Sequence, residues 1–209
     1  MRVKRFRSRQ LAGAVGAVAA GLGGAGSADA GVVYQLVNVA IPPDYNVDLN
    51  GDAIREFVIN HYVDAAVGDN LIKATDYATG AGSLRDGGGR VANLAAGTLI
   101  GPGSGVYTSA GEDNLTGLKG GAAVGNFQVS NGPGFIGLQF LIGADTHYGY
   151  VGYEGTAPAN TGSGRVYSLA YESVPLTPIV AGAVPEPSSL ALLAAGAVGV
   201  TAYRRRRTA

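Results

Sequence analysis

Short runs of alternating apolar and polar residues, separated by clusters of Gly and Pro, fill the middle of the chain. In the run YSLAYES, which starts at Tyr167, a large side chain occupies every second position. This period of two is typical of a β-strand with one face buried. The predicted strands, all rich in Val, Ile, Tyr or Phe, are residues 32–41, 56–62, 124–130, 135–142, 148–154 and 166–172.

The segment between these strand groups, residues 80–125, is rich in glycine and holds only short apolar runs. One of them, 91–100, fits a strand or a short helix, and its pattern does not decide between the two. No stretch from 31 to 183 shows comparably clear helical periodicity. We therefore predict an all-β fold, a single jelly-roll-like β-sandwich domain that spans 31–183.

The N-terminal segment 1–30 has the three parts of a secretory signal peptide. Five cations lie between positions 2 and 9, an uncharged Ala-, Val-, Leu- and Gly-rich run covers 11–25, and Ala28-Asp29-Ala30 follows. Small residues at Ala28 and Ala30 predict cleavage after Ala30 by signal peptidase. A buried core helix is disfavoured, because the run is rich in glycine and is flanked by cations. This segment is thus predicted to direct export.

The C-terminal segment 184–209 predicts a single hydrophobic helix. An uncharged run, 188–203, follows two prolines and precedes four arginines. A helix of that length reaches about 24 Å, short for a hydrocarbon core of about 30 Å. The run shows no polar face, so we expect it to enter the membrane rather than lie on it. The predicted stop-transfer anchor on the cytoplasmic side consists of Arg204, Arg205, Arg206 and Arg207.

Pro185, Glu186 and Pro187, the small-residue hydrophobic run and the terminal arginines together resemble a PEP-CTERM sorting signal. The resemblance covers the segment 184–209. It implies a protein exported through the inner membrane to the cell envelope, the outer surface or the extracellular space. It also implies recognition of the Pro-Glu-Pro motif by an exosortase, a membrane transpeptidase, and loss of the helix on processing.

Charge and cysteine content exclude some classes of function and site for the middle domain. Nine of the 15 Lys and Arg residues lie in the two terminal segments. Positions 31–183 therefore hold six cations and thirteen acids, a net charge of −7. Such a domain repels nucleic acid. The chain has no Cys, so disulfides and thiolate metal sites are excluded.

The stretch NVDLNGDAIRE, positions 46–56, carries oxygen-bearing side chains at the spacing of a calcium loop. Counted from Asp48, the side chains of Asp48, Asn50, Asp52 and Glu56 stand at positions 1, 3, 5 and 9. Ca²⁺ takes 6–8 oxygen ligands, so Ca²⁺ is the expected cofactor if the loop binds a metal. Ala53 occupies the usual glycine position. The alternative is an Asx-turn whose side chains bond only backbone amides.

The sequence offers no assembled catalytic site. A G-x-G-x-x-G match at 132–137 precedes a predicted strand rather than a helix, which disfavours a dinucleotide site. His61 and His147 have no obvious local partners for acid-base or zinc chemistry, and Asp145-Thr146-His147 is predicted to be an exposed loop entering a strand. G-x-S-x-G is absent. We therefore expect no enzymatic activity.

These features favour a non-enzymatic protein with a structural or adhesive role in the envelope or extracellular matrix. The first alternative is a carbohydrate-binding module acting on exopolysaccharide, with Tyr148, Tyr150 and Tyr153 as its aromatic platform. The second is a glycan-active enzyme, which is disfavoured because the sequence identifies no close pair of carboxylates.

Overall fold

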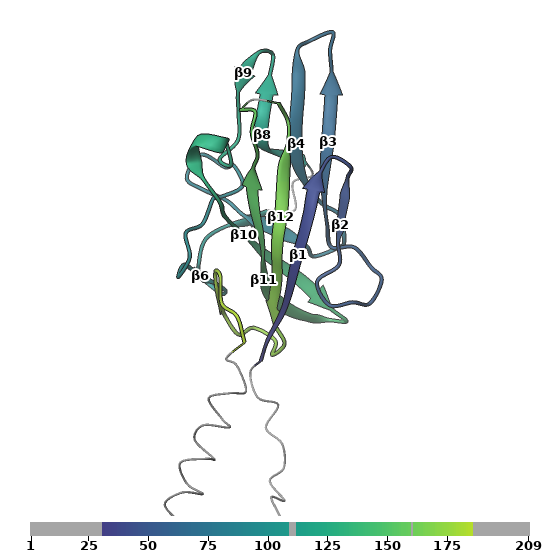
Figure 1. The fold of residues 1–209 in the computed structure, drawn as a ribbon. Helices are drawn as coiled ribbons and strands as arrows, with labels where there is room; N and C mark the ends of the chain where they lie inside the picture. Colours follow the sequence, from purple (N-terminus) through teal and green to yellow (C-terminus); the bar gives the residue numbers. More distant parts are fainter. Residues whose placement is uncertain (1–30, 109–111, 160, 186–209) are drawn as a thin grey trace, which may run out of the picture.

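Two antiparallel sheets dominate the computed structural model, which describes residues 31–108, 112–159 and 161–185 (Figure 1). The large sheet contains, in spatial order, β1 (Val32–Ile41), β12 (Gly164–Glu172), β11 (Asp145–Gly155), β10 (Gly134–Ile142), β5 (Gly82–Leu84) and β7 (Tyr107–Thr108). The small sheet contains β2 (Tyr45–Val47), β3 (Phe57–Asp64), β4 (Asp69–Asp76), β8 (Glu112–Lys119) and β9 (Ala122–Ala123). An all-β sandwich is confirmed.

The main core lies between the two sheets, where alternate side chains of each strand meet. Val166 and Leu169 of β12 pack there with Phe57 and Ile59 of β3 and with Phe140 of β10. Each of these side chains is almost fully buried. The burial of one face of every long strand is the main stabilising contribution that the alternating pattern predicts.

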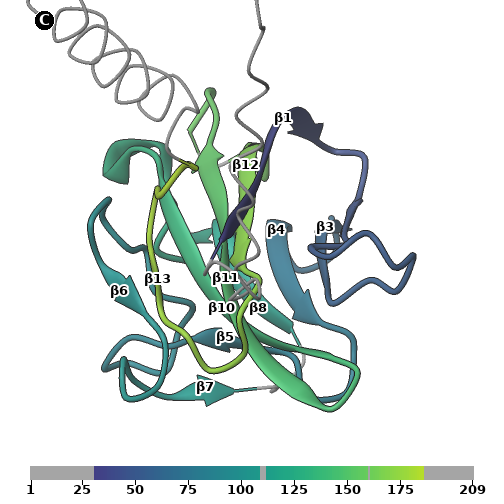
Figure 2. The ribbon, with the colours of Figure 1, turned by 90° about the horizontal axis from the view of Figure 1, so that it is seen from below.

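A second, smaller core covers the other face of the large sheet. There β6 (Leu99–Ile100) pairs with β13 (Ile179–Val180). Figure 2 shows this two-stranded pair on one side of β10 and β11, with β3 and β4 on the other side. Ile100 and Ile179 pack against Tyr148 and Tyr150 of β11. The central part of the large sheet is therefore covered on both faces.

Five of the six predicted strands are present. They correspond to β1, β3, β10, β11 and β12, and β1 has the predicted bounds. The prediction of a strand at 124–130 is wrong, because this segment is a loop ending in a short 3-10 helix, Val129–Asn131. Gly125 has φ +88° there and lies against the main-chain carbonyl of Leu115. The loop carries Phe127, which is fully buried, into the main core.

The sequence pattern leaves residues 91–100 open between a strand and a short helix, and the structure shows neither over the whole segment. Only Leu99–Ile100 forms a strand, β6, and the rest follows turns and isolated bridges. Asp145 and His147 are predicted to lie in an exposed loop that enters a strand, and this prediction is wrong in part. Both lie in β11, which begins before the predicted strand does. Asp145 is exposed as predicted, whereas His147 is buried with 4% of its surface exposed.

The two targeting segments lie almost entirely outside the described residues. Ala28, Ala30, Glu186, Pro187 and the arginine cluster fall there, and Pro185 is the last described residue, on the surface. Among the residues that the structure describes, no helix combines the length and apolar character needed to cross a membrane. The described chain enters and leaves at the same end of the sandwich (Figure 1).

Candidate functional site

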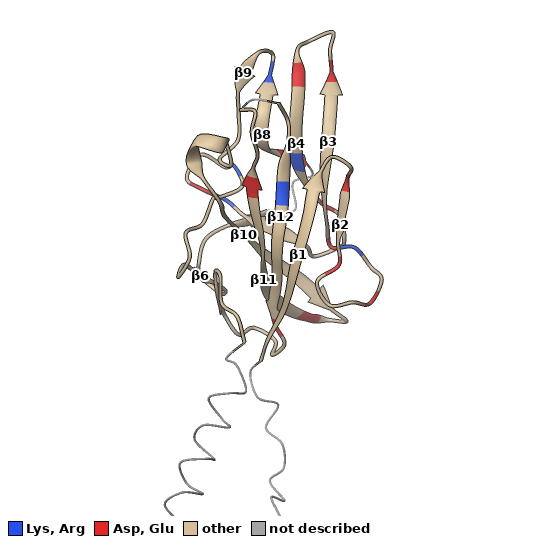
Figure 3. Cartoon of the chain, viewed as in Figure 1, with Lys and Arg blue, Asp and Glu red and all other residues tan. Residues whose placement is uncertain are grey.

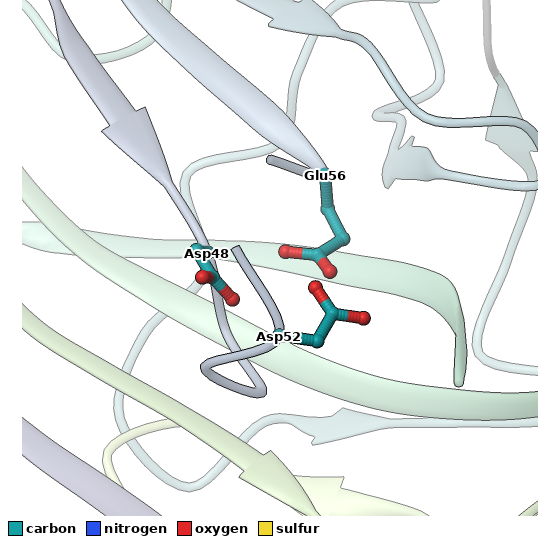
Figure 4. A group of neighbouring side chains, drawn as sticks. All are labelled: Asp48, Asp52 and Glu56. Atoms are coloured by element: carbon teal, nitrogen blue, oxygen red, sulfur yellow. The ribbon is translucent and has the colours of Figure 1, made fainter. Parts of the chain in front are cut away.

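The loop from Asp48 to Glu56 joins β2 to β3 and places three of the four predicted metal ligands together. One carboxylate oxygen from each of Asp48, Asp52 and Glu56 lies within 4.8 Å of the others. Figure 4 shows the three side chains converging at the entry to β3. Asn50 lies beside this group, because its amide oxygen accepts a 3.1 Å hydrogen bond from the Asp52 main-chain N–H and its amide nitrogen donates one of 3.0 Å to Asp52 Oδ2.

Side-chain bonds to the backbone hold this loop in shape. Asp48 accepts hydrogen bonds from the N–H groups of Gly51 (2.7 Å) and Ala53 (2.9 Å). Asp52 accepts one from the N–H of Ile54 at 2.7 Å. The predicted Asx-turn is therefore present. A carboxylate offers about four lone-pair positions, so these bonds leave oxygen electrons free for a cation.

Glu56 is the most buried of the three carboxylates. It is 2% exposed, and its Oε2 accepts a 2.9 Å hydrogen bond from the Leu49 N–H. Burial raises the pKa of the Glu56 carboxyl, the Leu49 amide opposes that rise, and the negative charges of Asp48 and Asp52 add to it. None of the ion pairs among the described residues includes these three carboxylates. A cation bound between them would offset their mutual repulsion.

Ala53 adopts the backbone conformation that a glycine has in such loops. Its φ is +68°, in the left-handed region, which is unfavourable for a residue with a Cβ. The sequence departs from the usual loop pattern at this position, yet the backbone does not. The tight turn that brings Asp48 and Asp52 together is therefore formed at a cost in strain.

The two histidines do not assemble a catalytic group. His61 Nε2 lies 2.8 Å from the side-chain oxygen of Asn70, across the β3–β4 pair. His147 Nδ1 lies 2.9 Å from the main-chain oxygen of Glu172. Each ring is thus engaged in a hydrogen bond between neighbouring strands or segments.

The aromatic platform predicted at Tyr148, Tyr150 and Tyr153 is wrong, because all three side chains are buried. Their exposed fractions are 5%, 0% and 0%. Tyr148 and Tyr150 face the second core under the β6–β13 pair, whereas Tyr153 enters the main core and packs against Phe127. None of the three is available to stack on a sugar.

A different aromatic residue, Tyr167 of β12, lines two adjoining hollows on the outer face of the large sheet, and so does Arg165. We call this region the Tyr167 groove. Its other lining residues are Ala96, Pro133, Phe135 and Glu154 on one side and Leu36, Val37 and Asn38 on the other. Arg165 Nε donates a 2.8 Å hydrogen bond to Glu154.

Irregular pairing places the Tyr167 ring in this groove. Neither β1 nor β11 offers Tyr167 a paired residue, since both registers shift beside it. Such bulges re-aim a side chain. The ring lies close over Gly152, where a Cβ would collide with it, and the hydroxyl donates a 2.8 Å hydrogen bond to the Gly134 carbonyl. Sequence periodicity gave no signal for this arrangement.

A comparison with known families decides the nature of the C-terminal segment. The model described as the PEP-CTERM protein-sorting motif matches residues 183–207. The chain carries a PEP-CTERM sorting motif. The match begins shortly after β13 and covers the positions of the Pro-Glu-Pro motif, the uncharged run and the four arginines. No curated protein and no solved structure gave a significant match to the chain.

The PEP-CTERM motif implies export, processing by an exosortase and a final location at the cell surface or outside the cell. It covers none of the sandwich strands. The acidic loop and the Tyr167 groove therefore have to be interpreted from their own chemistry.

Proposed function

We propose that the sandwich is the cargo that the PEP-CTERM motif delivers, and that it has a structural or adhesive, non-enzymatic role in the cell envelope or extracellular matrix. One observation carries this proposal. The motif match starts at residue 183, just after the last strand, Ile179–Val180. The segment 31–183 therefore leads straight into the sorting signal, and the domain is the part that processing would leave behind.

The charge of the domain supports a role in a hydrated matrix. Acidic residues outnumber basic ones in the segment 31–183, and they are spread over several strands and loops (Figure 3). A net negative charge keeps a secreted domain soluble and favours contacts through divalent cations or hydroxyl groups over contacts with nucleic acid. The buried His147 and Glu172 make hydrogen bonds to the main chain, which supports a structural use of these groups.

The test is fractionation of the native cells with and without the exosortase. We expect the protein of exosortase-positive cells to be in the envelope or matrix fraction, with a mass that lacks the C-terminal helix. In cells without the enzyme it should stay in the inner membrane at the larger mass. A protein found soluble in the cytoplasm, or one with the same mass and location in both strains, would contradict the proposal.

The Tyr167 groove favours a second function, binding of a polysaccharide of the matrix. Sugar rings stack on aromatic faces, and their hydroxyl pairs bond to planar groups such as guanidinium, carboxylate and amide. Tyr167 supplies the ring, while Arg165, Glu154 and Asn38 supply the polar groups. The exposed Leu36 side chain, 76% accessible, extends the apolar floor.

The exopolysaccharide of the native cells is the probe for this second function. Retention of the protein on the insoluble polymer should fall about fivefold or more in Tyr167→Ala, by analogy with the stacking of a nucleic-acid base on an aromatic ring, which supplies about 1–3 kcal/mol. Tyr77→Ala is the matched control, because Tyr77 is 57% exposed but lies outside the groove. Equal retention of the two variants would exclude the groove as the binding site.

A further inference from the structure

Glu172, the last residue of β12, holds the start of the described chain. Its side chain accepts a hydrogen bond from the Gly31 nitrogen at 2.9 Å and another from the Val174 N–H at 3.1 Å. The Ser173 N–H donates to the Gly31 carbonyl at 3.1 Å. Gly31 is therefore fixed through both its nitrogen and its oxygen, 141 positions away in sequence from Glu172.

The carboxylate of Glu172 is buried without a cation beside it. Glu172 is 4% exposed, and it takes part in none of the ion pairs found among the described residues. His147 approaches the main-chain oxygen of Glu172 and gives its hydrogen bond there. A buried carboxylate is costly unless a positive charge or several hydrogen bonds compensate it. The atom best placed to become that charge is the Gly31 nitrogen.

We propose that Glu172 is the receptor for the α-ammonium group that signal peptidase creates at Gly31. Hydrolysis of the Ala30–Gly31 amide consumes one water, leaves a carboxylate on Ala30 and frees an amine on Gly31. That amine, with an ordinary pKa near 8, takes a proton from solvent at neutral pH. The neutral N–H donor at 2.9 Å from Glu172 then becomes a charged donor, and the hydrogen bond becomes a charge-assisted one.

Cleavage thus adds a partly buried ion pair between the first residue of the mature chain and the end of β12. β1 follows Gly31 directly and pairs with β12 along its length. The new charge therefore stabilises the pairing of β1, an edge strand of the large sheet, with β12 once the signal peptide has been removed. The inference rests on the predicted cut after Ala30, and it assigns a role to that cut beyond export.

The test compares two forms of the chain that extend to Ala209, one beginning at Gly31 and one at Ala28. The longer form keeps the Ala30–Gly31 amide and moves its amine up to about 10 Å along the chain. Each form is made with Glu172, with Glu172→Gln and with Glu112→Gln. Glu112 is the matched control, since it forms an exposed ion pair with Lys73 at 2.8 Å.

With Glu172 present, we expect the chain that starts at Gly31 to melt about 3 °C or more above the longer one. The difference should vanish in Glu172→Gln and persist in Glu112→Gln, as a double-mutant cycle requires. A difference that survives Glu172→Gln, or no difference with Glu172 present, would overturn the proposal. A first residue other than Gly31 in the native protein, read by mass, would also overturn it, without affecting the evidence for sorting.

Discussion

The hydroxyl of Tyr150 donates a hydrogen bond of 2.6 Å to the main-chain oxygen of Ala183. Tyr150 is fully buried in the middle of β11, and Ala183 is the first residue matched by the sorting motif. Burial raises the pKa of Tyr150, so the hydroxyl stays protonated and can donate. This contact fixes the boundary between the folded cargo and its sorting signal.

Tyr150→Phe should loosen that boundary and leave the sandwich folded. The change removes one hydrogen bond, a loss of about 0.5–1.5 kcal/mol. Amide exchange at Ala181 and Ala183 should therefore become roughly 2- to 12-fold faster. Tyr107→Phe is the control, because its hydroxyl donates to the Gly101 carbonyl at 3.3 Å rather than to Ala183. Equal acceleration in both variants would show that the Tyr150 bond has no special role there.

Removal of Arg204, Arg205, Arg206 and Arg207 should weaken retention of the unprocessed protein in the membrane. The uncharged run 188–203 is short for a bilayer, so the basic tail has to hold its end on the cytoplasmic side. We expect the protein to be released prematurely with its C-terminal helix still attached. The measurement is the intact mass of the protein recovered from the culture medium. Arg90→Gln, a charge loss within the domain, should be retained and processed like the native chain.

The long strands could be predicted from sequence because their pattern reports directly on burial. In β12, Val166 and Leu169 face one core and Ala170 the other. β4 and β8 were missed because their ends are polar and because Gly117 in β8 looks like a turn residue. The structure explains that glycine differently. Its φ is +121°, and a Cβ there would collide with the Asn70 carbonyl of β4.

The two candidate sites differ in how well they could be predicted from the sequence. The acidic loop is local, so the spacing of Asp48, Asp52 and Glu56 was enough to bring the three together. The Tyr167 groove combines residues from β1, β11 and β12 with bulges on both sides of Tyr167, and nothing in the chain order predicts this. The tyrosine platform failed for a related reason. The strands that cover Tyr148 and Tyr150, β6 and β13, are two residues each, too short for periodicity to reveal, and Tyr153 is buried in the main core.

Asp76 should make the domain less stable as the pH rises from about 4 to 7. Burial raises the pKa of Asp76 to about 6, although the Arg85 guanidinium, 3.6 Å away, opposes the shift. The folded state therefore binds the proton more tightly than the unfolded state does. The stabilisation by protonated Asp76 is complete below about pH 4 and is lost as the pH passes 6, in total about 3 kcal/mol.

The measurement is urea unfolding of the native chain and of Asp76→Asn at pH 4, 5, 6 and 7. The native chain should lose stability relative to the variant across this series. Glu56 also has a raised pKa, but it is present in both proteins, so its effect cancels in the difference. Asp145→Asn, at an exposed strand end, is the control and should follow the native curve. A pH-independent gap between native and Asp76→Asn would contradict the prediction.

Ala53→Gly should stabilise the loop before β3. Ala53 has φ +68°, and the left-handed conformation costs a residue with a Cβ about 1–2 kcal/mol. We expect a melting temperature roughly 2–4 °C higher per kcal/mol gained. Ala66→Gly, in the β3–β4 turn at a negative φ, should lower it, because glycine there adds only chain entropy to the unfolded state. A lower melting temperature in both variants would indicate that Ala53 is not strained.

Calcium should raise the melting temperature of the domain if the three converging carboxylates bind it. The ion would bind the folded loop much better than the unfolded chain. At a concentration a hundred times the dissociation constant, mass action then adds about 2.7 kcal/mol. The measurement is a thermal melt in calcium and in chelator. Identical curves would leave the loop as an Asx-turn without a metal.

Substitutions in the loop test whether the gain in melting temperature comes from calcium bound there. Asp48→Ala should abolish it but also removes two hydrogen bonds to Gly51 and Ala53, so its stability without calcium falls as well. Asp52→Asn is sharper, because its side-chain oxygen can still accept from Ile54 while one negative charge is lost. Asp145→Ala should keep the full gain. A calcium gain that survives Asp52→Asn unchanged would place the ion elsewhere in the protein.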